Sequence, residues 1–131
     1  MIHLDTNIVI AFLNGNKSVT ERMREVIDEI ALSSFVVAEL DYGAKASRNS
    51  ERNLEKLYQF INLVNVVSFD LECAKIFGSI KHNLRKIGKP TGEVDAMIAA
   101  VSIACDAILV TANKKHFENI QDLKLDSWET D

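Results

Sequence analysis

Short apolar runs alternate with longer amphipathic stretches along this chain. The mostly apolar runs at 2–4, 31–33, 64–67 and 107–110 are typical of strands, and the continuous run at 107–110 is typical of a strand buried on both faces of a sheet. Between these runs, apolar residues recur every three or four positions opposite charged residues, which is the pattern of helices that pack one face on a core. The pattern predicts helices over 8–13, 20–30, 35–45, 52–63, 70–86 and 93–104, a turn at 113–117 and an edge strand at 123–125.

Because strands and helices alternate, we expect an α/β fold with a small central parallel sheet and helices on both faces, a three-layer α/β/α sandwich. The 131 residues fit one domain, 1–131. No apolar run approaches the roughly 20 residues that span a bilayer, so we expect no membrane association. The two cysteines lack C-x-x-C spacing and are expected to be reduced, which indicates a cytoplasmic protein.

Polar side chains follow two of the predicted strands. Asp5 ends the first strand, Thr111 ends the strand at 107–110, and Asn113 comes two residues later. Ligands of open parallel sheets bind outside the carboxyl ends of the strands. If the two strands are neighbours, these three side chains share one rim of the sheet.

Asp95 and Glu39 each allow more than one interpretation when taken alone. Asp95 lies in the first turn of a predicted helix, where the helix dipole favours an acid, so by itself it indicates only a helix start. Glu93 should point to the far side of that helix, into solvent. Glu39 has apolar neighbours, so we expect a largely buried carboxylate that needs a partner. A cation, a hydrogen-bonding network or a lysine or arginine would each satisfy it.

Carboxylate and amide oxygens gathered on one rim repel one another unless a positive charge lies between them. Such ligands, without a cysteine cluster, select Mg²⁺ or Mn²⁺ over zinc. Magnesium with open water positions supports the hydrolysis of phosphodiesters. The net charge of −4 argues mildly against non-specific binding of nucleic acid, but it is compatible with carboxylates around a cation or with a basic partner.

Four segments of the sequence resemble, in order, the motifs of VapC-type PIN domains, the toxin ribonucleases of prokaryotic toxin–antitoxin pairs. They are the opening MIHLDTN at 1–7, AELDYGA at 38–44, PTGEVDAMIAA at 90–100, and TANKKHF at 111–117. Residues 123–128 also look like the closing strand of that family. Each motif is weak alone, but all four occur in order, and the resemblance covers the whole chain.

The resemblance implies a PIN-like fold and a metal-dependent endoribonuclease that cleaves single-stranded or looped RNA to inhibit translation and growth. It also implies a homodimer and a VapB-like antitoxin that inserts a peptide across the cleft. The metal ligands for Mg²⁺, or Mn²⁺, would be Asp5, Glu39 and Asp95, and Asn113 would join them in catalysis. Thr6 and Thr111 would position water, carboxylates or the scissile phosphate.

One position departs from the family pattern. Many relatives have an acid just before the phenylalanine of the fourth motif, where this chain has His116. A histidine there could ligate manganese, move a proton or lie in solvent as a turn residue. Next to it, Lys114 and Lys115 could steer the RNA backbone toward the rim. Aromatic residues make up only 7%, so composition does not predict base stacking, and we expect specificity for the shape of the RNA.

Two alternatives remain beside the ribonuclease. A phosphate-ester hydrolase for small molecules would also place an aspartate after the first strand. The aspartyl-phosphate type has a second aspartate two residues later, where this chain has Asn7. A catalytically silent PIN-like binding module is the other alternative, and His116 is the only feature that favours it.

Overall fold

The computed structural model describes residues 1–130, and its centre is a parallel sheet. The order of the strands across the five-stranded sheet is β3-β2-β1-β4-β5, and each neighbouring pair is parallel. The strands are β1 (Ile2–Leu4), β2 (Ile30–Ser33), β3 (Asn65–Val67), β4 (Ile108–Thr111) and β5 (Lys124–Ser127).

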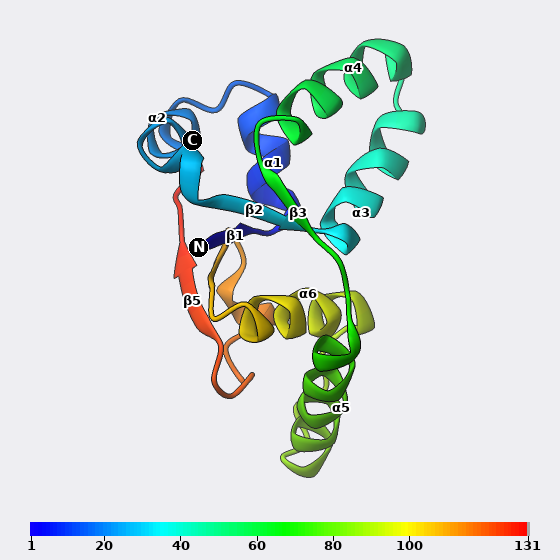
Figure 1. The fold of residues 1–131 in the computed structure, drawn as a ribbon, viewed down its shortest axis with the longest axis vertical. Coiled ribbons are helices and arrows are strands. Elements are labelled where there is room, and N and C mark those ends of the chain that lie inside the picture. The colour runs from blue at the N-terminus through cyan, green and yellow to red at the C-terminus, as the bar shows by residue number, and fades with distance from the viewer. Residues whose placement is uncertain (131) are drawn as a thin grey trace.

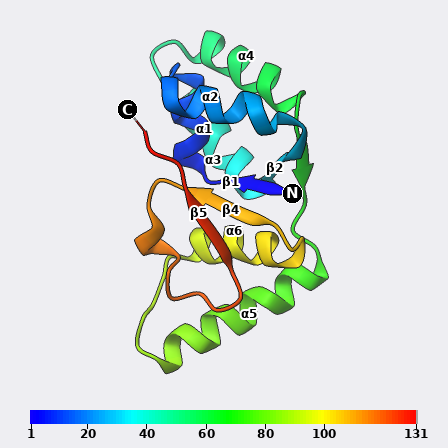
Figure 2. The same ribbon diagram turned by 90° about the vertical axis from the view of Figure 1, so that its left-hand side faces the viewer.

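Helices cover both faces of this sheet, as Figure 2 shows. Helices α1 to α4 lie on one face, and α5 and α6 lie on the other. The three-layer α/β/α fold predicted from the sequence is therefore confirmed. The helices are α1 (Thr6–Leu13), α2 (Lys17–Val26), α3 (Ser34–Lys45), α4 (Ser50–Ile61), α5 (Leu71–Lys86) and α6 (Glu93–Ala104), with short 3₁₀ turns η1 (Ile27–Glu29) and η2 (Lys114–His116).

Local sequence explains where several helices begin and end. The side chains of Asp5, Ser33 and Asp70 each accept a hydrogen bond from a backbone N–H in the first turn of α1, α3 and α5. Such bonds satisfy donors that the helix itself leaves free. After α1 and α5 the chain turns through Gly15 and Gly88, whose φ angles of 80° and 67° favour glycine.

The core lies between the sheet and the two helical layers. Helix α6 packs under the centre of the sheet, in the middle of the fold in Figure 1, and it buries an unbroken run of residues from Ile98 to Ser102. The central strands contribute Leu4, Leu32 and Leu109, all almost fully buried. None of the helices in residues 1–130 has the length and apolar character that crossing a bilayer requires.

Two element predictions need correction. The helix expected over 20–30 is α2 at 17–26, followed by η1, and Ile30 belongs to β2, where it pairs with Ile2 of β1. Ile30 has helical spacing from earlier apolar residues, but hydrogen bonding to the neighbouring strand prevails over that pattern. Strand β4 is not buried throughout, because Ile108 is 40% exposed.

Candidate active site

The rim at the carboxyl ends of β1 and β4 brings together residues that are more than 100 positions apart in sequence. The two strands are parallel neighbours with Leu4 opposite Val110. The backbone N–H of Asp5 donates to the carbonyl of Val110 at 2.9 Å. Asp5 and Thr111 therefore lie side by side at one edge of the sheet, as the strand pattern predicted.

Asp5 is a buried carboxylate held by two hydrogen bonds. One oxygen, Oδ1, accepts from the backbone N–H of Thr6 at 2.9 Å, which caps α1. The other, Oδ2, accepts from the hydroxyl of Thr111 at 2.7 Å. The same Thr111 hydroxyl accepts from the backbone N–H of Asn113 at 3.0 Å. The end of β4, the start of α1 and the turn after β4 therefore together determine the orientation of the Asp5 carboxyl group.

Glu39 reaches the rim from α3. Its oxygen Oε1 accepts from the hydroxyl of Thr6 at 2.7 Å. The expectation that Glu39 is largely buried is wrong: α3 buries Val36 and Leu40, while Glu39 is exposed on the side that faces the rim. Of the partners that the sequence left open, the structure has a hydrogen bond, and no lysine or arginine in residues 1–130 forms an ion pair with Glu39.

Asp95 lies in the first turn of α6, and its partner is the histidine that departs from the family pattern. Nδ1 of His116 is 3.3 Å from Oδ2 of Asp95, and Nε2 is 3.0 Å from the amide nitrogen of Asn113. An amide N–H donates to a ring nitrogen that lacks a proton, so this geometry suits the tautomer with its proton on Nδ1, facing Asp95. His116 is 56% exposed, yet it is not a simple solvated turn residue.

These contacts form one continuous chain that connects three carboxylates. It starts at Glu39, passes through Asp5 on the sheet rim and ends at Asp95, so α3, the start of α1, β4, η2 and α6 all contribute. Every residue between the carboxylates is a hydroxyl, amide or imidazole that can donate a hydrogen bond. The members in order are Glu39, Thr6, Asp5, Thr111, Asn113, His116 and Asp95.

The negative charges on this rim affect the pKa of Asp95. Burial raises the pKa of the Asp95 carboxyl above its usual range, and the charges of Asp5 and Glu39 raise it further, while His116 opposes the rise. None of the three carboxylates has a lysine or arginine ion-pair partner in the described chain. The rim therefore concentrates negative charge that the protein itself does not neutralise.

The donors on this rim suit a hard divalent cation in their chemistry. All are carboxylate or amide oxygens, apart from the imidazole of His116, and such oxygens are the ligands that magnesium and manganese prefer. Through residue 130, however, no three histidine, cysteine, aspartate or glutamate side chains gather closely enough to form a metal group by themselves. Magnesium usually keeps several water ligands, so a shell completed by water is compatible with this spacing.

The basic residues near the rim differ in their contacts. Lys114 and Lys115 lie exposed on η2 beside the fourth motif, and Lys115 also lines a pocket next to Asp95. Lys81 instead forms an ion pair with Glu93 at 2.6 Å, so it belongs to a surface pair. Glu93 is exposed and takes no part in the chain of contacts, as expected from its helix position.

Sequence reasoning missed two residues that brace the site. The side chain of Asn7 accepts from the backbone N–H of Ala112 at 3.2 Å, which ties α1 to the turn after β4. The hydroxyl of Thr91 donates to the carbonyl of His116 at 2.9 Å. Asn7 and Thr91 both lie inside the motifs at 1–7 and 90–100, so the motifs could have pointed to them, although not to their partners.

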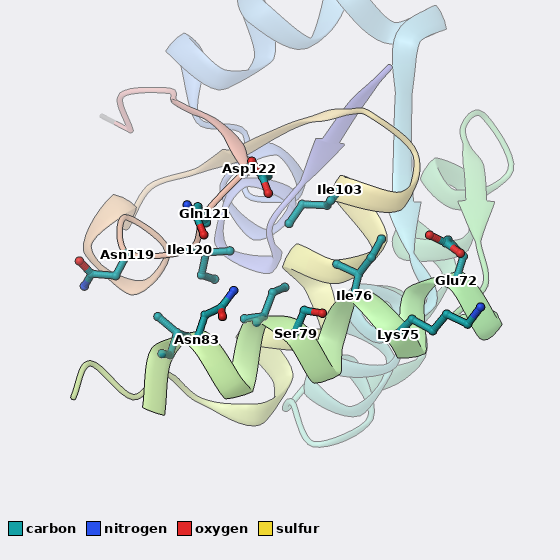
Figure 3. Close-up of a pocket in the computed structure, with 12 residues that line it drawn as sticks. Glu72, Lys75, Ile76, Ser79, Asn83, Ile103, Asn119, Ile120, Gln121 and Asp122 are labelled. Atoms are coloured by element: carbon teal, nitrogen blue, oxygen red, sulfur yellow. The ribbon is translucent and has the colours of Figure 1, made fainter. Parts of the chain in front are cut away.

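A second hollow, of about 310 Å³, lies between α5 and residues 119–122 and is drawn in Figure 3. Isoleucines form much of its wall, and Ser79, Asn83 and Gln121 add polar groups. None of the three rim carboxylates lines it. This pocket is therefore separate from the candidate active site.

Comparisons with known proteins agree with this geometry. The PIN domain family model matches residues 2–123. Ribonuclease VapC2 of Rickettsia felis is 35% identical over 129 residues, covering 96% of both chains, and the tRNA(fMet)-specific endonuclease VapC of Shigella flexneri is 36% identical over 126 residues, 95% of this chain and 96% of that one. The structure of DNA-bound VapBC from Salmonella typhimurium superposes with a TM-score of 0.93 at 32% identity, covering 98% of each chain. The chain belongs to the PIN-domain family, among the VapC-type ribonucleases.

Proposed function

We propose that this protein is a Mg²⁺- or Mn²⁺-dependent endoribonuclease and the toxin of a type II toxin–antitoxin system. The observation that carries the proposal is the rim on which Asp5, Glu39 and Asp95 converge without a lysine or arginine to neutralise them. Relatives over nearly the full chain length are named as ribonucleases or as a tRNA-specific endonuclease, which supports RNA as the substrate.

Each member of the contact chain has a part in this proposal. Asp5, Asp95 and Glu39 would hold the cation, which would supply polarisation of a phosphoryl oxygen and a lowered pKa for an attacking water. Thr111 orients Asp5, and Thr6 orients Glu39 through Oε1, which leaves Oε2 for a water that attacks the phosphodiester. Asn113 holds His116 against Asp95.

Charge and the relatives' partners extend the proposal to binding. Lys114 and Lys115 draw the RNA backbone to the rim, because ammonium groups position phosphates without reading sequence. The related structure from Salmonella typhimurium is titled as a VapBC complex bound to DNA, so we infer a VapB-like antitoxin for this chain. We also propose a homodimer of the toxin, which rests only on the resemblance of the motifs to the VapC family. The protein acts in the cytoplasm, where cleavage of its RNA stops translation.

Cleavage of RNA by antitoxin-free protein tests the proposal. Transfer, ribosomal and messenger RNA are incubated with Mg²⁺, Mn²⁺ or excess EDTA, and products are mapped by primer extension. The variants are Asp5→Asn and Asp95→Asn, with Glu93→Gln as the matched control, since Glu93 is an exposed acid in the same helix turn as Asp95. We expect metal-dependent cleavage that both site variants lose and the control keeps.

Full activity in Asp5→Asn and Asp95→Asn, or cleavage that persists in EDTA, would refute this site. Absence of cleavage from folded protein would instead favour a silent binding module, for which the replacement of an acid by His116 is the supporting observation. His116→Glu would then be the first variant to regain activity. Hydrolysis of small phosphate esters is not expected, because Asn7 binds the backbone of Ala112 where a second aspartate would be needed.

A further inference from the structure

A polar pocket of about 330 Å³ opens directly beside Asp95. It lies between the loop at 88–92 and the segment at 115–120, so two of the family motifs form its walls. Its volume falls at the lower end of the range in which proteins bind small organic groups. An RNA strand with a phosphate at Asp95 would therefore bring an adjoining nucleotide to this pocket.

His116 and Asp95 both line the pocket, so it adjoins one of the three rim carboxylates directly. The two ring nitrogens of His116 face Asp95 and Asn113, so the edge of the ring is engaged in the site. The side chain is nevertheless 56% exposed and lines the pocket. An imidazole bound by its edge still has its faces available, and nucleic-acid bases stack on the faces of histidine and aromatic rings.

Hydrogen bonds within the protein hold the wall of the pocket that includes His116. Thr91 donates from its hydroxyl to the carbonyl of His116 at 2.9 Å, which joins the two sides of the pocket. Lys81 in turn contacts the carbonyl of Thr91 at 3.4 Å and pairs with Glu93. The pocket is therefore preformed, and a ligand need not order its walls.

The lining combines apolar, amide and ammonium groups with the carboxylate of Asp95, the imidazole of His116 and the hydroxyl of Thr91. Leu84 and Ile120 are buried and form an apolar surface. Asn119 is exposed and its amide has no hydrogen-bond partner within residues 1–130. Lys89 and Lys115 have no carboxylate within 4.0 Å in the same part of the chain. An apolar surface, one amide and two ammonium groups match a nucleotide: a base, its polar edge and its phosphate.

We propose that this pocket binds the nucleotide adjoining the scissile phosphate of the RNA. His116 stacks on the base, the Asn119 amide bonds its edge, and Lys89 and Lys115 hold the neighbouring phosphate. This inference rests on the ribonuclease function proposed above and adds a preference for one base beside the cut. It departs from the expectation, based on the low aromatic content, that only RNA shape is read. The histidine that replaces an acid then serves as a base platform.

The test uses the cut mapped on RNA with the wild-type protein. Short RNAs of one sequence are synthesised with each of the four bases on either side of that cut, and kcat and KM are measured for each. For Asn119→Ala we expect KM to rise about tenfold for the preferred base, with kcat within about twofold, because a base-edge contact typically has this size. The preference among the four bases should weaken with it.

Asn83→Ala is the matched control. Asn83 lines the hollow of Figure 3 and not the pocket beside Asp95, although Leu84, Asn119 and Ile120 line both. In that view the amide of Asn119 points away from Asn83. We expect this control to keep the wild-type KM and base preference.

Two substitutions of His116 separate stacking from the contact with Asp95. His116→Phe keeps a flat ring and loses both ring nitrogens, whereas His116→Ala loses both features. We expect a similar fall of kcat in the two variants, but a rise of KM of about tenfold only in His116→Ala, from the loss of one stacked base. Unchanged KM and unchanged base preference in both His116→Ala and Asn119→Ala would overturn the pocket assignment.

Failure of the proposed function gives a different result from failure of the pocket. If the wild-type protein cleaves no RNA, the pocket is tested by binding of fluorescent short homopolymers of A, C, G and U to Asp5→Asn protein with Mg²⁺. The substitutions Asn119→Ala and Asn83→Ala are each combined with Asp5→Asn. If only Asn119→Ala weakens the binding of RNA, the pocket binds a nucleotide even though the protein does not cleave. Equal binding by all three proteins overturns it.

Discussion

At the scale of single residues, Asp95 shows a conflict between charge and environment. Its side chain is only 28% exposed, and burial is the first cause of its raised pKa. The nearby charges of Asp5 and Glu39 act in the same direction, and only His116 opposes them. A folded-state pKa above the unfolded one means that ionised Asp95 destabilises the metal-free protein at neutral pH.

Removal of this charge should therefore stabilise the protein without metal. For Asp95→Asn in EDTA at neutral pH, we expect the melting temperature to rise by about 2–5 °C, the shift that about 1 kcal/mol produces in a domain of this size. Differential scanning calorimetry measures it. Glu93→Gln is the control, because that exposed acid is paired with Lys81 and should give no such gain.

Addition of Mg²⁺ should reverse the order of the two proteins. A cation that binds only the folded wild-type protein raises its melting temperature, whereas Asp95→Asn has lost one ligand. Two results would contradict the assignment of Asp95 as a metal ligand. One is a melting temperature of Asp95→Asn below that of the wild type in EDTA. The other is a rise in melting temperature with Mg²⁺ that is as large in Asp95→Asn as in the wild type.

At the scale of elements, the site depends on the join between β1, α1 and β4. Asp5 ends one strand, caps the following helix and accepts from Thr111 at the end of the neighbouring strand. Thr111 is fully buried, so its hydroxyl has no access to water. A single side chain thus links the ends of two strands to the turn that carries Asn113.

Thr111→Val tests this link with little change in shape. The variant leaves Oδ2 of Asp5 and the N–H of Asn113 without their partner, so we expect a loss of about 1–3 kcal/mol in the free energy of unfolding. Urea denaturation measures that loss, and the cleavage assay should show kcat reduced by about tenfold or more, because Asp5 is no longer oriented. Thr111→Ser keeps the hydroxyl, so it should keep most of the free energy of unfolding and most of the wild-type kcat. Wild-type stability and kcat in Thr111→Val would show that the bond is dispensable.

At the scale of the whole molecule, the sheet and α6 meet around a buried histidine. His3 on β1 lies 3.0 Å from the hydroxyl of Ser102 on α6, and its other ring nitrogen is 3.2 Å from the sulfur of Met1. Burial, and to a lesser degree the positive N-terminus, lowers the pKa of His3 to about 4. The ring of His3 is packed inside the fold, with only 2% of the residue exposed.

The buried imidazole should make stability depend on pH. Because the unfolded chain has a histidine pKa near 6.5, it binds a proton between roughly pH 6.5 and 4 that the folded protein does not bind. The stabilisation is present above this window and is lost as pH falls through it. From pH 7.5 to pH 5 we expect His3 to account for a loss of about 2 kcal/mol in the free energy of unfolding.

Urea denaturation of the wild type and of His3→Gln at several pH values isolates this effect. The glutamine cannot titrate, so its free energy of unfolding should fall less on acidification, whatever its value at neutral pH. Parallel pH profiles for the two proteins would show that His3 titrates normally in the folded state.

Much of this architecture is readable in the sequence because it depends on local patterns. Apolar runs and amphipathic periods predicted every strand and helix of the fold, with most boundaries within two residues. Asp5 and Asn14-Gly15 mark the two ends of α1 through capping and turn chemistry. The order of the four motifs was enough to identify the family, since it is a property of the chain itself.

Only the tertiary structure decided what each of these residues contacts. Periodicity assigned Ile30 to a helix, but its partner on β1 made it part of a strand. Apolar neighbours suggested a buried Glu39, although a residue beside a buried helix face can still point to solvent at the sheet rim. His116 could be interpreted as a ligand, a proton carrier or a surface residue, until the fold set it against Asp95 and Asn113.

The physical reason is the range of the interactions involved. Helix capping, turn geometry and hydrophobic period act over a few residues, so they are determined by the sequence alone. The contact of Asp5 with Thr111 joins positions 106 residues apart, and it exists only because β1 and β4 pair in one register. The sequence determined which carboxylates and amides the protein has and where they stand in their elements, and strand pairing together with helix packing decided that they meet on one rim.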